Sequence, residues 1–293
     1  MARREPLGEI LRGATAQLRE SGSPTPRLDA EVLLAHVTGR DRAWLLANPE
    51  AELDEPAAFA AALARRAEGE PVAYIRGFKE WHALHLRTDA RALIPRPETE
   101  LLADAAIAEI AARLTRDGEP LVAWDVATGS GAVAVAVALR FRQALTLGRL
   151  ALIASDLSPD ALELASENLA EHGVDSLVGL ACADLLDPAG ETLSRPDVVT
   201  ANLPYVSSAD VDERRGSLGF EPRIALDGGP DGLVLLRRLM ADLPHRAAAG
   251  ATVLLEVGVD QANTIGAMVP AGASVTVVPD LAGLDRVVRI DLP

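Results

Sequence analysis

Short apolar runs alternate with helically spaced apolar residues from about residue 121 to the end of the chain. The runs predict seven strands, at 121–126, 150–155, 177–181, 197–201, 251–257, 274–278 and 286–291. Helical spacing predicts helices at 99–114, 132–140, 159–172, 231–246 and 260–268. Because strands and helices alternate, we expect an α/β fold with a mostly parallel sheet and crossover helices. The last two strands leave no room for a helix between them, which predicts an antiparallel pair.

Residues 5–68 show helical spacing only, which predicts a small bundle of four helices. Asp41 is the expected N-cap of the third helix, and Gly69 follows the expected end of the fourth. Residues 70–77 are rich in turn formers, and alternation from Trp81 to Leu86 predicts a β-hairpin. We therefore expect an all-α domain at 1–70, a hairpin connector at 71–93 and an α/β domain at 94–293.

Overall composition is that of an ordinary globular protein, with 49% hydrophobic and 24% charged residues. The net charge is −15, of which −2 lies in residues 1–77 (10 arginines, 12 acidic residues) and the remaining −13 in residues 78–293. Duplex nucleic acid is bound mainly through its phosphates, so this balance argues against a large nucleic-acid footprint. A basic protein partner or a cationic cofactor suits it better.

Residues that form disulfides or bind metals are few. Cys182 is the only cysteine, so no intrachain disulfide is possible, and we expect it to be a small core residue. His82 and His85 lie three apart, which in a strand directs them to opposite faces, so no metal site is expected. The N-terminus lacks an apolar signal core, and no run reaches the ~18 apolar residues of a membrane span. A cytoplasmic enzyme is the resulting expectation.

A glycine-containing loop follows the first predicted strand and precedes a helix. Such a loop lets the backbone approach a ligand closely, and the helix N-terminus offers free N–H groups. The expected cofactor contacts are Asp125, Ala127, Thr128, Gly129, Ser130 and Gly131. Residues 129–134 also fit the dinucleotide pattern G-x-G-x-x-A, so a nicotinamide enzyme is an alternative, as is a tight turn without ligand. Asp156, which ends the second strand, can accept the ribose hydroxyls of either cofactor.

Two acidic residues favour S-adenosylmethionine over a dinucleotide. Asp125 stands before the glycines, where a carboxylate can face a cationic methionine moiety but repels a pyrophosphate. Asp184 follows the third strand and can accept from an adenine amino group, while Leu185 can cover the adenine face. Each acid also fits an ordinary exposed turn residue.

The fourth predicted strand, 197–201, ends in Asn202-Leu203-Pro204-Tyr205. Asn202 should emerge at the carboxyl end of the strand, the edge where open α/β sheets bind ligands. Its side-chain oxygen, beside the Leu203 carbonyl, can hold a planar NH2 group. Asn-Pro-Pro-Tyr at this position marks methyltransferases acting on amide or exocyclic amino nitrogens, and Asn-Leu-Pro-Tyr resembles a variant of it. Asn202 as a mere turn former is the alternative.

Several motifs together identify a family. They are Leu93-Ile94-Pro95-Arg96-Pro97-Glu98-Thr99-Glu100, the 125–131 loop, Asn202–Tyr205, Glu221-Pro222 with Ala225-Leu226, and Gly228-Gly229-Pro230-Asp231-Gly232-Leu233. In that order they resemble the protein-(glutamine-N5) methyltransferases of peptide-chain release factors, over nearly the whole chain. The resemblance implies a seven-stranded, Rossmann-like methyltransferase sheet with a small N-terminal helical domain joined by a β-hairpin.

The resemblance also implies methyl transfer from S-adenosylmethionine to the glutamine amide of the Gly-Gly-Gln motif in class 1 release factors, which supports translation termination. Residues 127–131, Asp156 and Leu185 would then line the cofactor, and Asn202 would contact both cofactor and substrate. Leu203, Pro204 and Tyr205 would complete the glutamine pocket. The 94–100 segment would lie over the site, with Arg96 and Glu98 structural and Glu98 able to cap the next helix. The protein would be monomeric, with its helical domain docking the substrate.

Two positions depart from the family pattern, which usually has glycine at Ala127 and proline at Leu203. Alanine is acceptable if φ is negative there, but costs about 1 kcal/mol if φ is positive. Leu203 still supplies a backbone carbonyl, and Pro204 restrains it towards extended geometry. An amino methyltransferase acting on adenine in nucleic acid is the second reading, a nicotinamide oxidoreductase the third and a non-enzymatic interaction protein the fourth.

Overall fold

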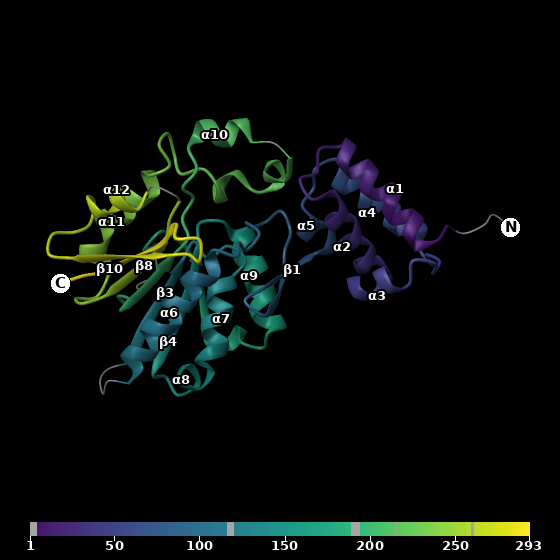
Figure 1. Cartoon of the computed structure of the whole chain (residues 1–293). Coiled ribbons are helices and arrows are strands. Elements are labelled where there is room, and N and C mark those ends of the chain that lie inside the picture. Colours follow the sequence, from purple (N-terminus) through teal and green to yellow (C-terminus); the bar gives the residue numbers. More distant parts are fainter. Residues whose placement is uncertain (1–4, 116–119, 189–193, 215, 259–260) are drawn as a thin grey trace. The chain divides into compact units, whose positions relative to one another are not determined.

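The computed structural model describes residues 5–115, 120–188, 194–214, 216–258 and 261–293. The chain forms two compact units (Figure 1). One comprises Met1–Phe78 with Arg214–Phe220, and the other Lys79–Glu213 with Glu221–Pro293. Each unit is described by itself.

A mixed sheet of seven long strands organises the larger unit. The strands are β3 (Leu121–Val126), β4 (Leu150–Asp156), β5 (Val178–Asp184), β7 (Val198–Ala201), β8 (Thr252–Glu256), β9 (Ser274–Pro279) and β10 (Asp285–Asp291). They lie in the order β5-β4-β3-β7-β8-β10-β9, with the two-residue β6 (Asp187–Pro188) antiparallel at the β5 edge. The first five are parallel, and β10 pairs antiparallel with both β8 and β9. The predicted seven-stranded fold is confirmed.

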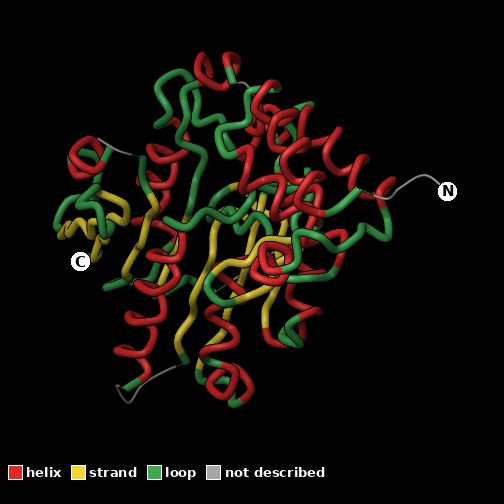
Figure 2. The backbone as a smooth tube through the Cα atoms, turned by 45° about the vertical axis from the view of Figure 1, so that its right-hand side comes forward, coloured by secondary structure: helices red, strands yellow, loops and turns green. Residues whose placement is uncertain are grey.

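Helices cover both faces of this sheet because its central strands are apolar on both sides (Figures 1 and 2). Val198 packs in one core with α6 (Thr99–Leu114) and α7 (Ala132–Arg140), whereas Val199 packs in the other with α11 (Val234–Arg246) and α12 (Ala262–Gly266). The remaining helices of the unit are α8 (Arg142–Thr146), α9 (Pro159–Glu171) and α10 (Ser208–Glu213), with short 3₁₀ turns η1 (Asp175–Leu177) and η3 (Arg223–Ala225).

The predicted element bounds hold closely for β3, α6 and α7 and shift at other elements. Helix α11 begins at Val234 rather than 231, because Gly232 adopts a φ of 71° that ends the preceding turn. Residue 260, the expected start of the last helix, lies outside the described residues. Cys182 is exposed, so its prediction as a core residue is wrong. It lies on β5 near the sheet edge, where side chains alternate between the core and solvent.

Helices α1 (Leu7–Glu20), α2 (Pro26–Thr38), α3 (Arg42–Ala47), α4 (Pro56–Ala67) and α5 (Val72–Arg76) build the smaller unit. Their shared core contains Leu18, Leu33 and Phe59. Asp41 caps α3 as expected, accepting from the Trp44 backbone N–H at 2.7 Å. The expectation of a turn at 70–77 is wrong, because 72–76 form α5. The 3₁₀ turn η2 (Gly216–Phe220) also belongs to this unit.

Strands β1 (Phe78–Trp81) and β2 (Leu84–Arg87) form the predicted hairpin. His82 lies in its two-residue turn with a φ of 48°, rather than in a strand as expected. Its backbone N–H donates to Glu100 Oε1 at 2.9 Å. Trp81 Nε1 donates to the Arg96 carbonyl at 2.7 Å, so the hairpin holds the segment that precedes α6.

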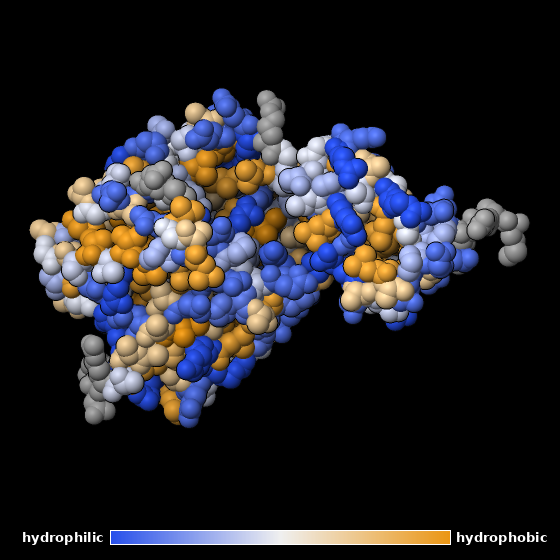
Figure 3. All heavy atoms as spheres, in the orientation of Figure 1, coloured by the Kyte–Doolittle hydropathy of each residue, from blue (hydrophilic) through white to orange (hydrophobic). Residues whose placement is uncertain are grey.

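Polar and apolar residues are interspersed on the face drawn in Figure 3. Within the described part of the chain, no helix combines the length and apolarity needed to cross a membrane.

Candidate active site

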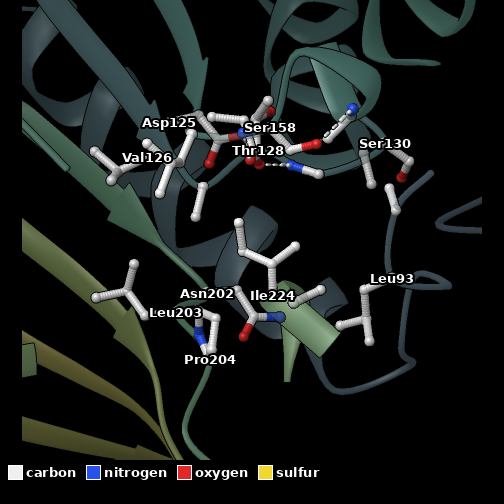
Figure 4. Close-up of a pocket in the computed structure, with 18 of the residues that line it drawn as sticks. Leu93, Asp125, Val126, Thr128, Ser130, Ser158, Asn202, Leu203, Pro204 and Ile224 are labelled. Carbon is white, nitrogen blue, oxygen red and sulfur yellow. Dashed lines mark hydrogen bonds between the residues drawn. The ribbon is translucent and has the colours of Figure 1, made fainter. Parts of the chain in front are cut away.

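A cavity lies at the carboxyl ends of β3, β4, β5 and β7, where parallel sheets bind ligands. The strand ends contribute Asp125–Ser130, Asp156–Ser158, Ala183–Leu185 and Asn202–Pro204. Other lining residues come from 91–99, from α7, α9 and α11, and from Pro222, Ile224 and Ala225. Asp125 and Thr128 lie across the cavity from Asn202 and Pro204 (Figure 4). The fold therefore brings the predicted cofactor loop and the Asn202 motif to one space.

Asp125 is the most deeply buried acid of the cavity, with 4% of its surface exposed. Its two carboxylate oxygens accept from the hydroxyls of Thr200, at 2.7 Å, and Thr128, at 2.6 Å. Burial raises its pKa to about 6, aided by the nearby negative charge of Asp156, while the two hydroxyls lower it. A buried carboxylate held this way favours a cationic ligand group.

Backbone N–H groups orient Asp156. It accepts from the N–H of Gly129 at 2.9 Å and from that of Ser158 at 2.9 Å. Burial raises its pKa and the backbone N–H donors lower it. Each oxygen keeps a second lone pair, so the carboxylate is positioned to accept from vicinal hydroxyls.

The loop between β3 and α7 needs an unusual backbone. Gly131 has a φ of 79°, and a Cβ there would lie 3.1 Å from the Ala165 Cβ. It packs against α9 and is not among the residues lining the cavity, unlike Ala127, Thr128, Gly129 and Ser130. Ala127 has a φ of 54°, so the strained alternative considered for this departure applies.

Leu185 and Asp184 line the cavity at the end of β5. Leu185 is buried with a φ of 58°. The Asp184 carboxylate accepts from Arg238 Nη2 at 2.8 Å. One of its oxygens thus has a protein partner, and an adenine amino group would share this acid with Arg238.

Asn202 emerges directly after β7, as predicted. Its Nδ2 donates to the Thr99 hydroxyl at 3.2 Å. Leu203 is 2% exposed, and both line the cavity with Pro204. Tyr205 is not among the lining residues and lies beside Gly258, whose Cβ would stand 3.2 Å from its ring. Burial raises the pKa of the Tyr205 hydroxyl.

The Gly228–Leu233 run supports this motif from behind. A Cβ on Gly228 would lie 2.6 Å from the Pro204 carbonyl oxygen, and one on Gly232 would lie 2.2 Å from that of Tyr205. The Gly228 N–H donates to the Val206 carbonyl at 2.8 Å. These glycines let two backbone segments touch, which fixes the direction of the Pro204 and Tyr205 carbonyls.

Relatives of this chain match it over most of their length. A release factor glutamine methyltransferase of Neisseria gonorrhoeae is 40% identical over 269 residues, covering 90% of this chain and 93% of that protein. One of Deinococcus radiodurans is 38% identical over 287 residues, covering 97% of each. The family described as PrmC N-terminal domain matches residues 9–77. The chain belongs to the release factor glutamine methyltransferase family.

Membership of this family confirms the predicted enzyme class and cofactor, an S-adenosylmethionine-dependent methyltransferase. Among solved structures, the hMettl16 catalytic domain, in complex with an RNA hairpin, matches with a TM-score of 0.50. The match covers 84% of this chain and 86% of the hMettl16 chain at 11% identity, so the likeness is one of fold alone.

The family segment Ile94–Glu100 lies at the cavity, and an ion pair holds it there. Buried Glu221 accepts from Arg96 Nη2 at 2.5 Å and from the Ile94 backbone N–H at 3.1 Å. Glu98 stands at the N-cap of α6, but its side chain makes no capping hydrogen bond with the described residues. The capping alternative for Glu98 is therefore wrong, whereas Arg96 has the structural contact expected of it.

Several lining residues were not predicted, among them Leu93, Ser158 and Ile224. Leu93 and Ile224 form an apolar wall opposite the acids (Figure 4). Ser158 was detectable as the N-cap of α9, because it precedes Pro159 and its hydroxyl accepts from the Ala161 N–H at 3.3 Å. Nothing local in the sequence marks Leu93 or Ile224 as lining residues.

Proposed function

We propose that this protein transfers a methyl group from S-adenosylmethionine to the side-chain amide nitrogen of the glutamine in the Gly-Gly-Gln motif of class 1 peptide-chain release factors. The observation that carries the proposal is that buried Asp125, half-buried Asp156 and the Asn202–Pro204 motif share one cavity. Asp125 and Asp156 suit a cationic cofactor with ribose hydroxyls. Asn202 and Leu203 suit a carboxamide NH2. The family to which the chain belongs supports the same reaction.

The residues present fit the cofactor. Asp125 would face its cationic end, Asp156 would accept from the ribose hydroxyls, and Leu185 would cover the adenine. Residues 127–130 line the cavity, so this loop would lie against the cofactor. When bound, S-adenosylmethionine supplies a methyl group activated by the sulfonium.

A carboxamide nitrogen is a weak nucleophile because its lone pair is delocalised into the carbonyl. The task of the protein is therefore to position and desolvate the amide. In this proposal the Asn202 Oδ1 and the Leu203 carbonyl oxygen accept the two amide hydrogens. The two acceptors fix the plane of the substrate amide and aim its nitrogen into the cavity. This contact uses the backbone carbonyl of residue 203. Leucine has that carbonyl as proline does, so the departure from the family pattern preserves the contact.

Apolar walls complete the arrangement by excluding water. Leu93, Ile224 and Leu203 line the cavity around the polar groups. Hydrogen bonds to the substrate amide are stronger in such surroundings than in water. The substrate nitrogen loses one of its own protons after methylation, when it has become acidic, so Asn202 serves as acceptor rather than base.

We assign docking of the protein substrate to the helical unit at 1–70, with 71–93 as connector and 94–293 as the methyltransferase domain. The net charge of −15 supports a basic protein surface as partner over nucleic acid. The proposal includes a monomeric enzyme acting in the cytoplasm, where release factors work.

Mass spectrometry of a release factor after incubation with enzyme and S-adenosylmethionine tests the proposal. The expected result is a single methyl group on the glutamine of Gly-Gly-Gln. A factor with that glutamine replaced by alanine serves as the matched control and remains unmodified. Methylation of an RNA or DNA adenine instead, with the factor untouched, would establish the amino methyltransferase alternative.

A further inference from the structure

Glu256 is a buried acid that the proposed mechanism has not used. It ends β8, is 4% exposed and does not line the cavity. Parallel pairing of Ala201 with Leu255 places it on the neighbouring strand level with Asn202. Its Oε2 has no hydrogen-bond partner within the described residues. Burying a carboxyl group without a full set of hydrogen bonds costs folding free energy. A residue kept at such a cost is a candidate for a functional role.

Glu256 and Asn202 meet at Thr99. The Thr99 hydroxyl oxygen accepts from Asn202 Nδ2 at 3.2 Å, and Thr99 is itself buried. Both the Thr99 hydroxyl and the Asn202 amide lie close enough to Glu256 to favour its ionised form. The Thr99 hydroxyl has a single hydrogen. When the carboxylate takes that hydrogen, only lone pairs of Thr99 remain for Asn202.

We propose that Glu256 is a positioning residue for methyl transfer, which acts through Thr99 to hold the Asn202 amide with its oxygen towards the cavity. This inference rests on the proposed function of Asn202. The two ends of an asparagine amide have nearly the same shape, so only hydrogen bonds decide its orientation. If the Thr99 hydroxyl were free to donate, it could equally bond to the Asn202 oxygen, which would stabilise the reversed orientation of the amide. The reversed amide would present NH2 to the substrate NH2, and neither group can accept from the other.

The ionised form of Glu256 is the one that fixes this orientation. Burial raises its pKa to about 7, with Thr99 lowering it, Glu98 raising it, and Arg286 and Asn202 lowering it. Tyr205 lies close enough for the negative charge of Glu256 to raise the pKa of its hydroxyl. Arg286 is held by Asp280 through a hydrogen bond of 2.9 Å. Turnover should therefore fall as pH drops through about 7, because protonated Glu256 has a hydrogen that it can donate to the Thr99 oxygen, which leaves the Thr99 hydrogen free for the Asn202 oxygen.

The kinetic test compares the full-length enzyme with Glu256→Gln and with the control Thr252→Val. Thr252 is buried at the opposite end of β8 and bonds to Asp291 at 2.7 Å, so its loss perturbs the same strand away from the cavity. Glu256→Gln should lower kcat about tenfold, at the scale of losing one supporting contact behind a functional group. It should also remove the acidic limb of the kcat profile near pH 7. Its affinity for S-adenosylmethionine should be unchanged.

A second measurement needs no substrate. The side-chain amide resonances of Asn202, followed by ¹⁵N NMR, should shift with a midpoint near pH 7 in the parent protein and in Thr252→Val. They should show no such titration in Glu256→Gln. If kcat, its pH profile and these resonances are unaltered in folded Glu256→Gln, the positioning role is overturned. If the resonances titrate as expected but no release factor is methylated, the proposed function fails while the positioning of Asn202 stands.

Discussion

Replacement of Thr200 by valine isolates the electrostatic design of the cofactor site. Thr200 lies outside the cavity lining, and its hydroxyl donates to Asp125 Oδ1 at 2.7 Å. The variant keeps a β-branched residue on β7 and removes one of the two side-chain hydroxyls that stabilise the Asp125 carboxylate. Since that hydrogen bond favours the ionised form, its loss raises the pKa of Asp125.

The size of the effect follows from the geometry. A hydrogen bond to a charged group contributes about 1.5–3 kcal/mol, which corresponds to roughly 1–2 pKa units. The pKa of Asp125 is about 6 in the parent protein. In the variant it should lie at about 7–8, so the ionised fraction at pH 7 falls from about nine-tenths to half or less. Neutral Asp125 attracts the cationic cofactor less than ionised Asp125 does. As pH is lowered, the variant should therefore lose affinity for S-adenosylmethionine at a higher pH than the parent protein.

Isothermal titration of S-adenosylmethionine between about pH 5 and 9, a range that extends about one unit beyond the expected pKa values on each side, measures this shift. The parent protein should lose affinity as pH falls through about 6. The Thr200→Val variant should lose it about 1–2 units higher. Comparison of the two proteins cancels the titration of the ligand itself. An acid limb at the same pH in both would refute the assignment of Asp125 to the cationic end of the cofactor.

Three further substitutions test the backbone and the buried acids. Ala127→Gly should relieve the strain of a φ of 54° and raise Tm by about 2 °C in a thermal melt, about 1 kcal/mol; an unchanged or lower Tm contradicts this. Gly228→Ala places a Cβ 2.6 Å from the Pro204 oxygen, so methylation should fall about tenfold or more with cofactor affinity retained. Normal turnover there would refute the support role of this run. Folding raises the pKa of Glu256 from 4.5 to about 7, so its neutral form stabilises the fold below pH 4.5 and that stability is lost as pH rises through 7. Between pH 4.5 and 7 the free energy of unfolding, measured with denaturant, should fall by roughly 3 kcal/mol more in the parent than in Glu256→Gln. The same pH dependence in both proteins would contradict the claim that burial raises the pKa of Glu256.

The sheet was predictable because its strands are continuous apolar runs, of which the central ones are buried on both faces. The bounds of β3 match the sequence pattern, and the antiparallel closing pair followed from the missing helix between β9 and β10. Helix α10 and the turn η3 were missed, because 206–225 has no helical repeat of apolar residues. Cys182 was misplaced since a sequence does not reveal which strand lies at the edge of the sheet.

The candidate site divides in the same way. Asp125, Asp156 and Asn202 were predictable because each lies at or next to the carboxyl end of a strand, and parallel strands bring such positions together. Glu221 and Glu256 were not singled out for the site, since their roles depend on contacts with residues more than a hundred positions away or on a neighbouring strand. The sign of φ at Ala127 was left open, because the presence of alanine does not by itself determine whether φ is negative or positive.

The single-turnover rate of Asn202→Ala on a class 1 release factor tests the central claim most directly. Loss of one preorganised acceptor should slow methylation of the glutamine by about 10²-fold, measured at saturating S-adenosylmethionine. A rate close to that of the parent, in a folded variant, would contradict the assignment of the substrate amide to Asn202 and the Leu203 carbonyl.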